Sequence, residues 1–341
     1  MSSPVTKSLP VLLGPSEATP GGTLLLTAMD TALASLPMVA LFIFDRPIDQ
    51  AAETIRRALS RALVPYYPVA GRLDGTAHGL TIACTGEGVA FVAALASCTL
   101  QDARLTEPRP AVSLEELTPT YAGQYTMDPP LLLMQVTEFS CGRFVVGVTW
   151  DHVIADGVGM AQFLQAVGEF ARGSSSLSVA PVRLDYCHPD FPPPIISMTK
   201  ALVSSSHNEF PSSYISVPVS FINLRPCLAN GDILDLVRQV KEAKARVSYT
   251  FVNGAGEMGG RLRGTSGYDT LFVTSWWNLG FDDIDFGAGG PVQVVGDMKR
   301  KVLPSCILCG RKDKADGVAA MALCVREEHQ EAFLAELRKL E

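Results

Sequence analysis

The sequence predicts an α/β protein whose two strand-rich halves are joined by a long crossover. Apolar runs with strand character occur in both halves, helical periodicity follows several of them, and a Ser- and Pro-rich stretch separates the halves. With 341 residues, 47% of them hydrophobic and 18% charged, the chain can bury a sizeable core. We expect three parts, at residues 1–175, 176–230 and 231–341.

The first half begins with a buried strand and an amphipathic helix. The apolar run at 36–44 is too short to span a membrane, which takes about 20 apolar residues, and suits a buried strand. Apolar side chains then recur at helical spacing, with arginines on the other face, until Pro65 and Pro68 end the helix. Strand-like runs follow at 80–83 and 89–95. The apolar positions of the helix are Ile48, Ala52, Ile55, Leu59 and Ala62.

The middle of the chain has the pattern of strand, loop and helix. Residues 131–137 and 144–150 are β-type runs around a polar turn, which predicts a hairpin. The loop that follows carries His152 and Asp156, and from Gly157 the period becomes helical. The apolar stripe of this helix consists of Met160, Phe163, Leu164, Val167 and Phe170.

The second half begins after the predicted crossover. Residues 174–231 are rich in Ser and Pro and show no clear periodic helix. A helix is expected from Asp232, a residue type that caps helix N-termini. The last third alternates strands with loops and closes with a helix. The expected strands are 270–274, 291–295 and 318–325, and the closing helix carries Phe333, Leu337 and Leu340.

Charge and composition exclude several classes of protein. A formal net charge of −7 argues against a nucleic-acid partner, which needs a basic face. No stretch has the pattern of a signal peptide or a membrane span, so we expect a cytoplasmic protein, without membrane contact, whose eight cysteines are reduced thiols. Cys306 and Cys309 form a lone CxxC without a second pair or nearby histidines, so we interpret them as core or strand cysteines and expect no metal.

His152 is the candidate catalytic residue. It directly follows a buried-looking strand, and an imidazole can act as a general base near neutral pH. A structural histidine is the alternative, because a lone histidine is more often structural. Asp156 suits an N-cap that accepts from Val158 or Gly159 better than it suits one half of a zinc pair. Residues 254–259 spell GxGxxG, but more glycines follow where a dinucleotide site needs a helix, so we set this motif aside.

Two motifs, in the same order, resemble the signatures of one enzyme family. His152–Gly157 (HVIADG) matches the HXXXD-G signature of the plant BAHD acyltransferases. Asp285–Pro291 (DFGAGGP) is similar to their DFGWG signature, with Ala288 where the family has tryptophan. Further stretches that resemble family segments are Pro65–Leu73 and Thr274–Trp276.

The resemblance covers nearly the whole chain and implies both a fold and a reaction. The fold is α/β, with two chloramphenicol-acetyltransferase-like domains, each a mixed β-sheet with helices, joined by a long crossover. His152 would take the proton from a hydroxyl or amine of a plant specialised metabolite as this attacks an acyl-CoA thioester, through a tetrahedral intermediate. Acyl-CoA is then a co-substrate, and no cofactor is bound permanently. The expected partners are acyl-CoA and a small alcohol, phenol or amine, and the expected state is a monomer.

The resemblance also assigns roles to residues around His152. Asp156 would orient the loop through an ion pair, and Asp285 would hold a loop beside the cleft. Thr274 and Trp276 would lie near the oxyanion and position the substrate, with strand and core packing as the alternative. The structural positions of the two motifs are Gly157, Phe286, Gly287 and Gly289.

The chain is shorter than members of this family, and the shortage is concentrated around residues 221–230. Family members carry several helices and strands of the second domain at this point, together with a Tyr-x-Gly-Asn motif that is missing here. We therefore interpret 176–230 as crossover and deletion junction, and 231–341 as a shortened C-terminal domain. An inactive truncated member that keeps at most ligand or partner binding is the alternative to an active transferase, and thioester hydrolysis is a third hypothesis.

Overall fold

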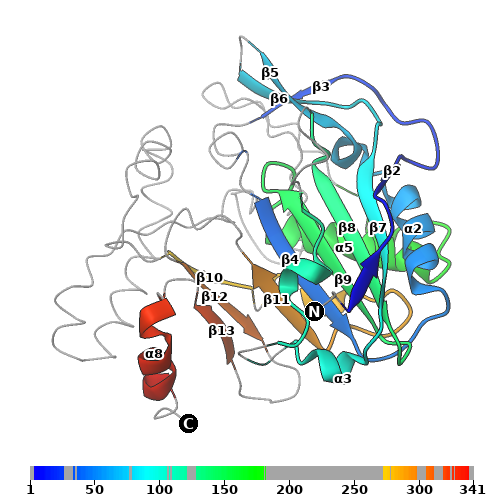
Figure 1. Cartoon of the computed structure of the whole chain (residues 1–341). Helices are drawn as coiled ribbons and strands as arrows, with labels where there is room; N and C mark the ends of the chain where they lie inside the picture. Colours follow the sequence, from blue (N-terminus) through cyan, green and yellow to red (C-terminus); the bar gives the residue numbers. More distant parts are fainter. Residues whose placement is uncertain are drawn as a thin grey trace, which may run out of the picture.

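A large mixed β-sheet forms the centre of the structure, which is a computed structural model (Figure 1). In the described part of the chain this sheet has seven strands, and parallel and antiparallel pairs both occur. Their order is β1 (Val5–Lys7), β7 (Val89–Ala96), β8 (Leu132–Phe139), β9 (Phe144–Asp151), β4 (Pro37–Phe44) and β11 (Gln293–Asp297), and β2 (Val11–Leu13) also pairs with β7. The structure describes residues 4–26, 34, 37–76, 79–105, 107, 110–120, 128–179, 181, 272–276, 278–297, 305–310, 318–322, 325 and 327–337.

The central sheet is buried on both faces, which explains why β4 has a continuous apolar sequence instead of an alternating one. On one face, Ala40, Phe42 and Phe44 join a large apolar cluster beneath the helices α2 (Ala51–Ala62) and α5 (Gly157–Ala171). On the other face, Leu41 and Ile43 join a smaller cluster. That second face is covered by the short helices α3 (Leu100–Ala103) and α4 (Leu114–Leu117).

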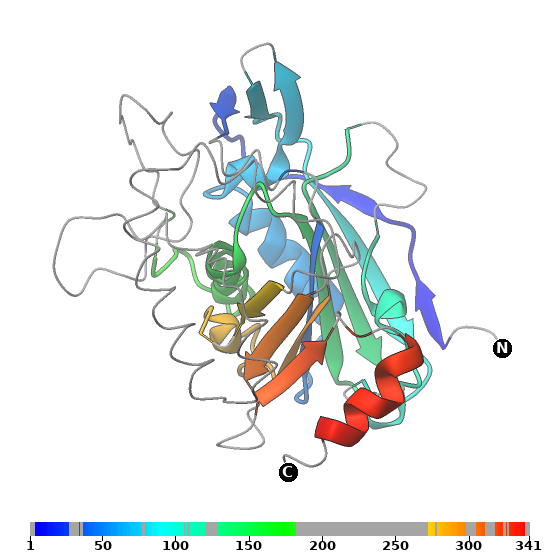
Figure 2. The same cartoon turned by 90° about the vertical axis from the view of Figure 1, so that its left-hand side faces the viewer.

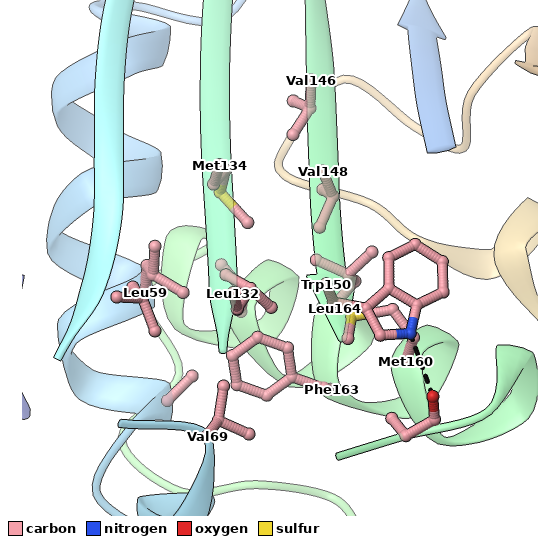
Figure 3. Packing of buried hydrophobic residues seen from close by; sticks show 14 of the residues in the cluster. Leu59, Val69, Leu132, Met134, Val146, Val148, Trp150, Met160, Phe163 and Leu164 are labelled. Carbon is pink, nitrogen blue, oxygen red and sulfur yellow. Dashed lines mark hydrogen bonds between the residues drawn. The ribbon is translucent and has the colours of Figure 1, made fainter. Parts of the chain in front are cut away.

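The larger cluster is an apolar core between the sheet and the two long helices (Figure 3). Trp150 of β9 and Phe163 of α5 are both fully buried in it. Phe44 and Phe144 stack with ring centroids 4.7 Å apart, which joins neighbouring strands β4 and β9. Since each fully buried large apolar side chain contributes roughly 1.5–3 kcal/mol, this core dominates the stability of the first half.

The predicted elements of the first half are all present, with small shifts at their ends. The helix expected from Ile48 begins at Ala51, because Gln50 takes a left-handed conformation with φ 48°. The Glu138 carboxylate of β8 accepts from the Ala52 amide (3.1 Å), so a neighbouring strand caps this helix. The predicted hairpin is confirmed as β8 and β9, with Leu132 opposite Trp150.

Two smaller sheets complete the described structure. One contains β3 (Thr23–Leu25), β6 (Gly79–Ala83) and β5 (Arg72–Thr76), and its strand β5 follows the 3-10 turn η1 (Tyr67–Ala70). The other comes from the last third and contains β10 (Phe272–Ser275), β12 (Ser305–Gly310) and β13 (Val318–Ala322). After it come η5 (Glu327–His329) and α8 (Gln330–Leu337).

The last third differs from its prediction in two respects. The strand expected at 291–295 lies at 293–297, where it pairs antiparallel with β4 and so extends the sheet of the first half. Strand β12 was not predicted, and it holds both Cys306 and Cys309, which agrees with their interpretation as strand cysteines. The helix expected from Asp232, most of the crossover and the glycine motif at 254–259 lie outside the described residues.

None of the helices in the described ranges has both the length and the apolar character needed to cross a bilayer.

Candidate active site

His152 lies in the loop that joins β9 to α5, directly after the last residue of the strand. Strand β9 is held on both sides, because Trp150 is in register with Met38 of β4 and with Leu132 of β8. The Asp151 amide donates to the Leu131 carbonyl (2.9 Å), which extends the sheet to the residue before the histidine. His152 itself is half-buried. The sheet therefore fixes the backbone immediately before His152.

The loop after His152 is fixed by three hydrogen bonds. The buried Trp150 indole Nε1 donates to the Ala155 carbonyl (2.9 Å), drawn as a dashed line in Figure 3. The Asp151 side chain accepts from the Val153 amide (3.0 Å), and its carbonyl accepts from the Ile154 amide (3.1 Å). A typical intramolecular hydrogen bond contributes about 0.5–1.5 kcal/mol, so together they hold the loop in one conformation.

Asp156 caps the N-terminus of α5, as its position in the sequence predicts. Its backbone is extended (φ −78°, ψ −174°), its Oδ1 accepts from the Gly159 amide (2.8 Å), and its carbonyl accepts from the Met160 amide (2.9 Å). The other oxygen, Oδ2, is buried and has no hydrogen-bond partner among the described residues. No cation in the described ranges makes the ion pair that the family resemblance implies for this carboxylate.

The second motif forms a tight loop that is organised by Asp285. Its Oδ1 accepts from the amides of Gly287 (2.7 Å) and Gly289 (2.8 Å). Both glycines have positive φ angles, 113° and 76°, which side chains with a Cβ rarely adopt. Phe286, which precedes both glycines, is buried with its ring centroid 5.4 Å from that of Phe44, so the loop is anchored in the core. Ala288, at the position of the family tryptophan, is also buried.

This loop is attached to the C-terminal end of α5. The Arg172 Nη1 donates to the Asp285 carbonyl and lies 3.7 Å from its Oδ2. A Cβ placed on Gly168 would lie 2.3 Å from the same carbonyl, so the contact requires glycine at that helical position. Because Gly168 has no side chain, α5 and the loop of the second motif can approach each other this closely.

The segment before the loop continues this contact toward the N-terminal end of α5 (Figure 2). Gln165 Nε2 donates to the Gly280 carbonyl (2.7 Å), at the start of η4 (Phe281–Asp283). Near the first turn, the Leu279 side chain lies over Gly157, where an added Cβ would meet its Cδ1 at 2.4 Å. The second motif and the residues before it therefore follow the helix that begins immediately after the His152 loop.

Thr274 and Trp276 come before this segment in the chain, Thr274 in β10 and Trp276 directly after it. The Trp276 side chain is buried, with its ring centroid 5.5 Å from that of Phe281, and its amide donates to the Leu308 carbonyl (2.7 Å). Gly296 of β11 lies against the indole, where an added Cβ would be 2.7 Å away. Thr274 lies in β10, in register with Ile307. The Trp276 ring is thus packed in the core. A role in positioning the substrate stays a prediction for both residues.

The aspartates of both motifs have structural contacts. Within the described ranges, no group of three or more His, Cys, Asp and Glu side chains is arranged to hold a metal ion. Asp156 is engaged by the helix and Asp285 by its own loop, so neither is placed as an acid or base. The imidazole of His152, at the end of a rigid strand, is the group whose chemistry suits a general base.

Several residues that shape this site were not singled out from the sequence. Gln165 and Arg172 each donate to a backbone carbonyl that is far away in the chain. Trp150 donates to a backbone carbonyl at the other end of the His152 loop. A signal was present for Gly168, because glycine inside an amphipathic helix costs stability and so indicates close approach of another backbone. The other three have side chains that are common in helices and strands and carry no such signal.

Comparison with known proteins supports the resemblance of the two motifs. The Transferase family matches residues 3–193 and 228–340. Acyl transferase 15 of Oryza sativa subsp. japonica is 34% identical, over 100% of this chain and 99% of the rice protein. The crystal structure of vinorine synthase has the same fold, with a TM-score of 0.61 at 20% identity over 96% of each chain. So does F. sporotrichioides TRI101 complexed with coenzyme A and T-2, with a TM-score of 0.53 at 14% identity, over 91% of this chain and 96% of TRI101.

These comparisons also bear on the missing segment. The alignment with the rice protein spans 433 positions, so at least 92 of them (433 less 341) contain no residue of this chain. The match to the family is interrupted between 193 and 228, an interval that includes most of the junction expected at 221–230.

Proposed function

Because the chain belongs to the Transferase family of BAHD-type, acyl-CoA-dependent acyltransferases that act on plant metabolites, we propose that it transfers an acyl group to a hydroxyl or amine with His152 as the general base. The observation that carries this proposal is the loop at 152–156. It is fixed by the Trp150 indole, by the Asp151 turn and by the Asp156 cap, and it places one imidazole at the end of a buried strand.

In the proposed reaction, the imidazole of His152 accepts the proton of the acceptor hydroxyl or amine as its oxygen or nitrogen attacks the thioester carbonyl carbon. The carbonyl oxygen becomes an oxyanion in a tetrahedral intermediate. When the intermediate collapses, the carbon–sulfur bond breaks, the CoA thiolate leaves and the imidazolium returns the proton to it. General-base catalysis of this kind contributes about 10²–10⁴-fold, and placing both substrates together contributes further.

The remaining residues of the two motifs have supporting roles in this proposal. Asp156 holds the first turn of α5 beside His152, and Asp285 holds the second loop against the other end of that helix. Thr274 and Trp276 are proposed to position the substrate near the oxyanion, Thr274 from β10 and Trp276 directly after it. Supporting roles for the two aspartates agree with their contacts, because Oδ1 of each one accepts hydrogen bonds from backbone amides.

The proposal extends to the architecture and to the substrates. We infer that 1–175 and 231–341 are parts of two related domains, the second one shortened, with 176–230 between them. TRI101, which shares the fold, was crystallised with coenzyme A and with T-2, which supports acyl-CoA and a small-molecule acceptor as the two ligands. We propose a cytosolic monomer that takes an alcohol, a phenol or an amine as acceptor.

An assay of CoA release tests this function. The purified 341-residue chain is supplied with acetyl, malonyl, benzoyl and hydroxycinnamoyl thioesters and with alcohol, phenol and amine acceptors. We expect CoA release that depends on an acceptor and falls by at least about 10²-fold in His152→Ala. His329→Ala is the matched control, because this histidine is exposed in η5 and should leave the rate unchanged. Release at the wild-type rate from His152→Ala would contradict the proposed base.

The gap in the alignment favours a second candidate function, which is ligand or partner binding without catalysis. At least 92 positions of the rice relative have no counterpart here, and Asp156 Oδ2 is buried without a partner among the described residues. If the missing segment shaped the channel for CoA, the folded chain would release no CoA with any donor and acceptor. Release without an acceptor, at a rate that depends on His152, would instead indicate thioester hydrolysis.

A further inference from the structure

At the end of the central sheet away from His152, two cysteines from different segments lie on neighbouring backbone. We propose that Cys141 and Cys98 form a redox-responsive thiol pair, in which a peroxide oxidises Cys141 and Cys98 closes a disulfide with it. Cys98 follows β7, and Cys141 lies in the turn between β8 and β9. Both are free thiols in the structure.

Hydrogen bonds fix these two segments side by side. The Ser140 amide donates to the Cys98 carbonyl (3.1 Å), and the Leu100 amide donates to the Cys141 sulfur (3.5 Å). Cys141 therefore directly follows the residue that bonds to Cys98, and its sulfur contacts the backbone two residues after Cys98. The Cys98 and Cys141 thiols are also close enough to affect each other electrostatically. The two thiols are therefore held near each other by contacts of their own segments, as a disulfide requires.

The two thiols differ in their environments, and the difference assigns their roles. Cys141 is exposed, whereas Cys98 is half-buried. Burial alone would raise the pKa of the Cys141 thiol. Backbone amides of Leu100, Arg143 and Cys141 itself, together with the Arg143 charge, lower the pKa of Cys141 below its usual value. The more accessible sulfur therefore has more thiolate character at neutral pH.

Cys98 has the opposite environment. Burial raises the pKa of the Cys98 thiol, and a backbone hydrogen bond opposes this only in part. The negative charges of Asp102, Cys141 and Glu116 raise the pKa of Cys98 further. Cys98 therefore stays protonated and is slow to react with an oxidant, but it is positioned to resolve an oxidised neighbour.

The chemistry balances with one peroxide. The Cys141 thiolate attacks hydrogen peroxide, its sulfur gains the hydroxyl oxygen as a sulfenic acid, and hydroxide leaves. The Cys98 sulfur then attacks the Cys141 sulfur, the new sulfur–sulfur bond forms, and the sulfenic oxygen leaves as water after taking the Cys98 proton. The hydroxide takes the proton that Cys141 lost on ionising and becomes the second water, so two thiols and one peroxide give one disulfide and two waters.

This site is separate from the proposed acyl-transfer site. The turn that holds Cys141 precedes β9 at Phe144, and His152 follows the other end of that strand at Asp151. The eight residues of β9 span seven steps of about 3.4 Å, so the strand that separates the two sites is roughly 24 Å long. The disulfide would join the turn of the hairpin to the end of β7. The proposal concerns only the oxidation state of the two cysteines at this end of the sheet.

Peptide mapping of the full chain tests the proposal. The reduced protein is treated with hydrogen peroxide, its remaining thiols are alkylated, and it is digested without reductant. We expect one crosslinked peptide pair joined through Cys98 and Cys141, which reductant separates. Products in which these two cysteines stay as thiols, or in which Cys141 is oxidised but never linked to Cys98, would overturn the inference without the use of any variant.

Variants then test the assigned roles. In Cys98→Ser, a sulfenic acid should accumulate on Cys141 and be trapped by dimedone. In Cys141→Ser, oxidation of Cys98 should slow by at least about tenfold, because its thiol is mostly protonated. Cys84→Ser is the matched control, since Cys84 is a buried cysteine outside the pair and should leave the crosslink intact. Equal oxidation of Cys98 with and without Cys141 would show that the order of reaction is wrong.

Discussion

Replacing Gly168 with alanine tests whether the loop of the second motif depends on close contact with α5. In an isolated helix this change is favourable, because alanine has a higher helix propensity than glycine by about 0.8–1.0 kcal/mol. In this structure the new Cβ would lie 2.3 Å from the Asp285 carbonyl oxygen and 3.0 Å from its carbon. Real Cβ atoms do not approach backbone so closely, so either the helix or the loop must move.

The size of the expected loss in stability depends on how firmly the loop of the second motif is held. Asp285 bonds to two amides of its own loop and to Arg172, and Phe286 is buried beside Phe44, so moving the loop disrupts packing as well as hydrogen bonds. Overpacking of this kind typically costs about 1–3 kcal/mol. We therefore expect Gly168→Ala to lower the free energy of unfolding by about 1–3 kcal/mol, the opposite sign from the helix propensity.

Gly157→Ala is a matched control on the same helix. Its Cβ would also meet a close neighbour, at 2.4 Å, but that atom is the end of the Leu279 side chain, which can rotate away. We expect this variant to stay within about 1 kcal/mol of the wild type in urea unfolding monitored by tryptophan fluorescence. If Gly168→Ala is as stable as Gly157→Ala or more stable than the wild type, the loop does not depend on this contact.

Three further predictions concern single side chains. Trp150→Phe removes the bond to the Ala155 carbonyl and should cost about 1–3 kcal/mol in chemical unfolding and slow CoA release; an unchanged rate would mean that the loop does not need this bond. Asp156→Ala should cost about 0.5–2 kcal/mol in thermal unfolding by loss of the cap to Gly159, whereas Asp156→Asn keeps an acceptor and should cost clearly less; equal losses would contradict the capping role. Burial raises the pKa of Tyr66 from 10.0 to about 12, so only the unfolded state ionises between these values, and stability should fall by up to about 2–3 kcal/mol as pH rises from 10 to 12. Tyr66→Phe should lose this extra slope, because phenylalanine has no group that ionises; an identical slope in the variant would show that another group causes it.

Local patterns in the sequence predicted the local parts of this structure. The apolar stripe at 160–170 predicted α5, and its first four positions are fully buried. The residue types at 152 and 156 predicted a loop with a candidate base and a helix cap, and the cap bonds to Gly159 as expected. Such features depend on neighbours within about one turn or one strand, where periodicity and capping rules apply.

Features that join distant segments were not predictable in this way. The cap of α2 comes from Glu138, 86 residues from the amide that it accepts from. The Arg172 contact with Asp285 joins residues 113 positions apart, and neither residue type signals its partner. Strand β12 lacks a clear alternating pattern, and it was missed for that reason. These contacts follow from how elements pack, which a single sequence does not encode locally.

The pairing of β4 with β11 has a consequence for how this protein is made. Ile43 of β4 pairs with Gln293, 250 residues later in the chain. At a synthesis rate of about 5–20 residues per second, the ribosome needs roughly 12–50 s to produce the partner of a strand that has already emerged. During this time one edge of an almost entirely apolar strand lacks its final neighbour, which makes the nascent chain a substrate for chaperones. Completion of the first sheet therefore has to wait for synthesis of the last third of the chain, and a ribosome that stops before residue 293 releases a sheet with an open edge.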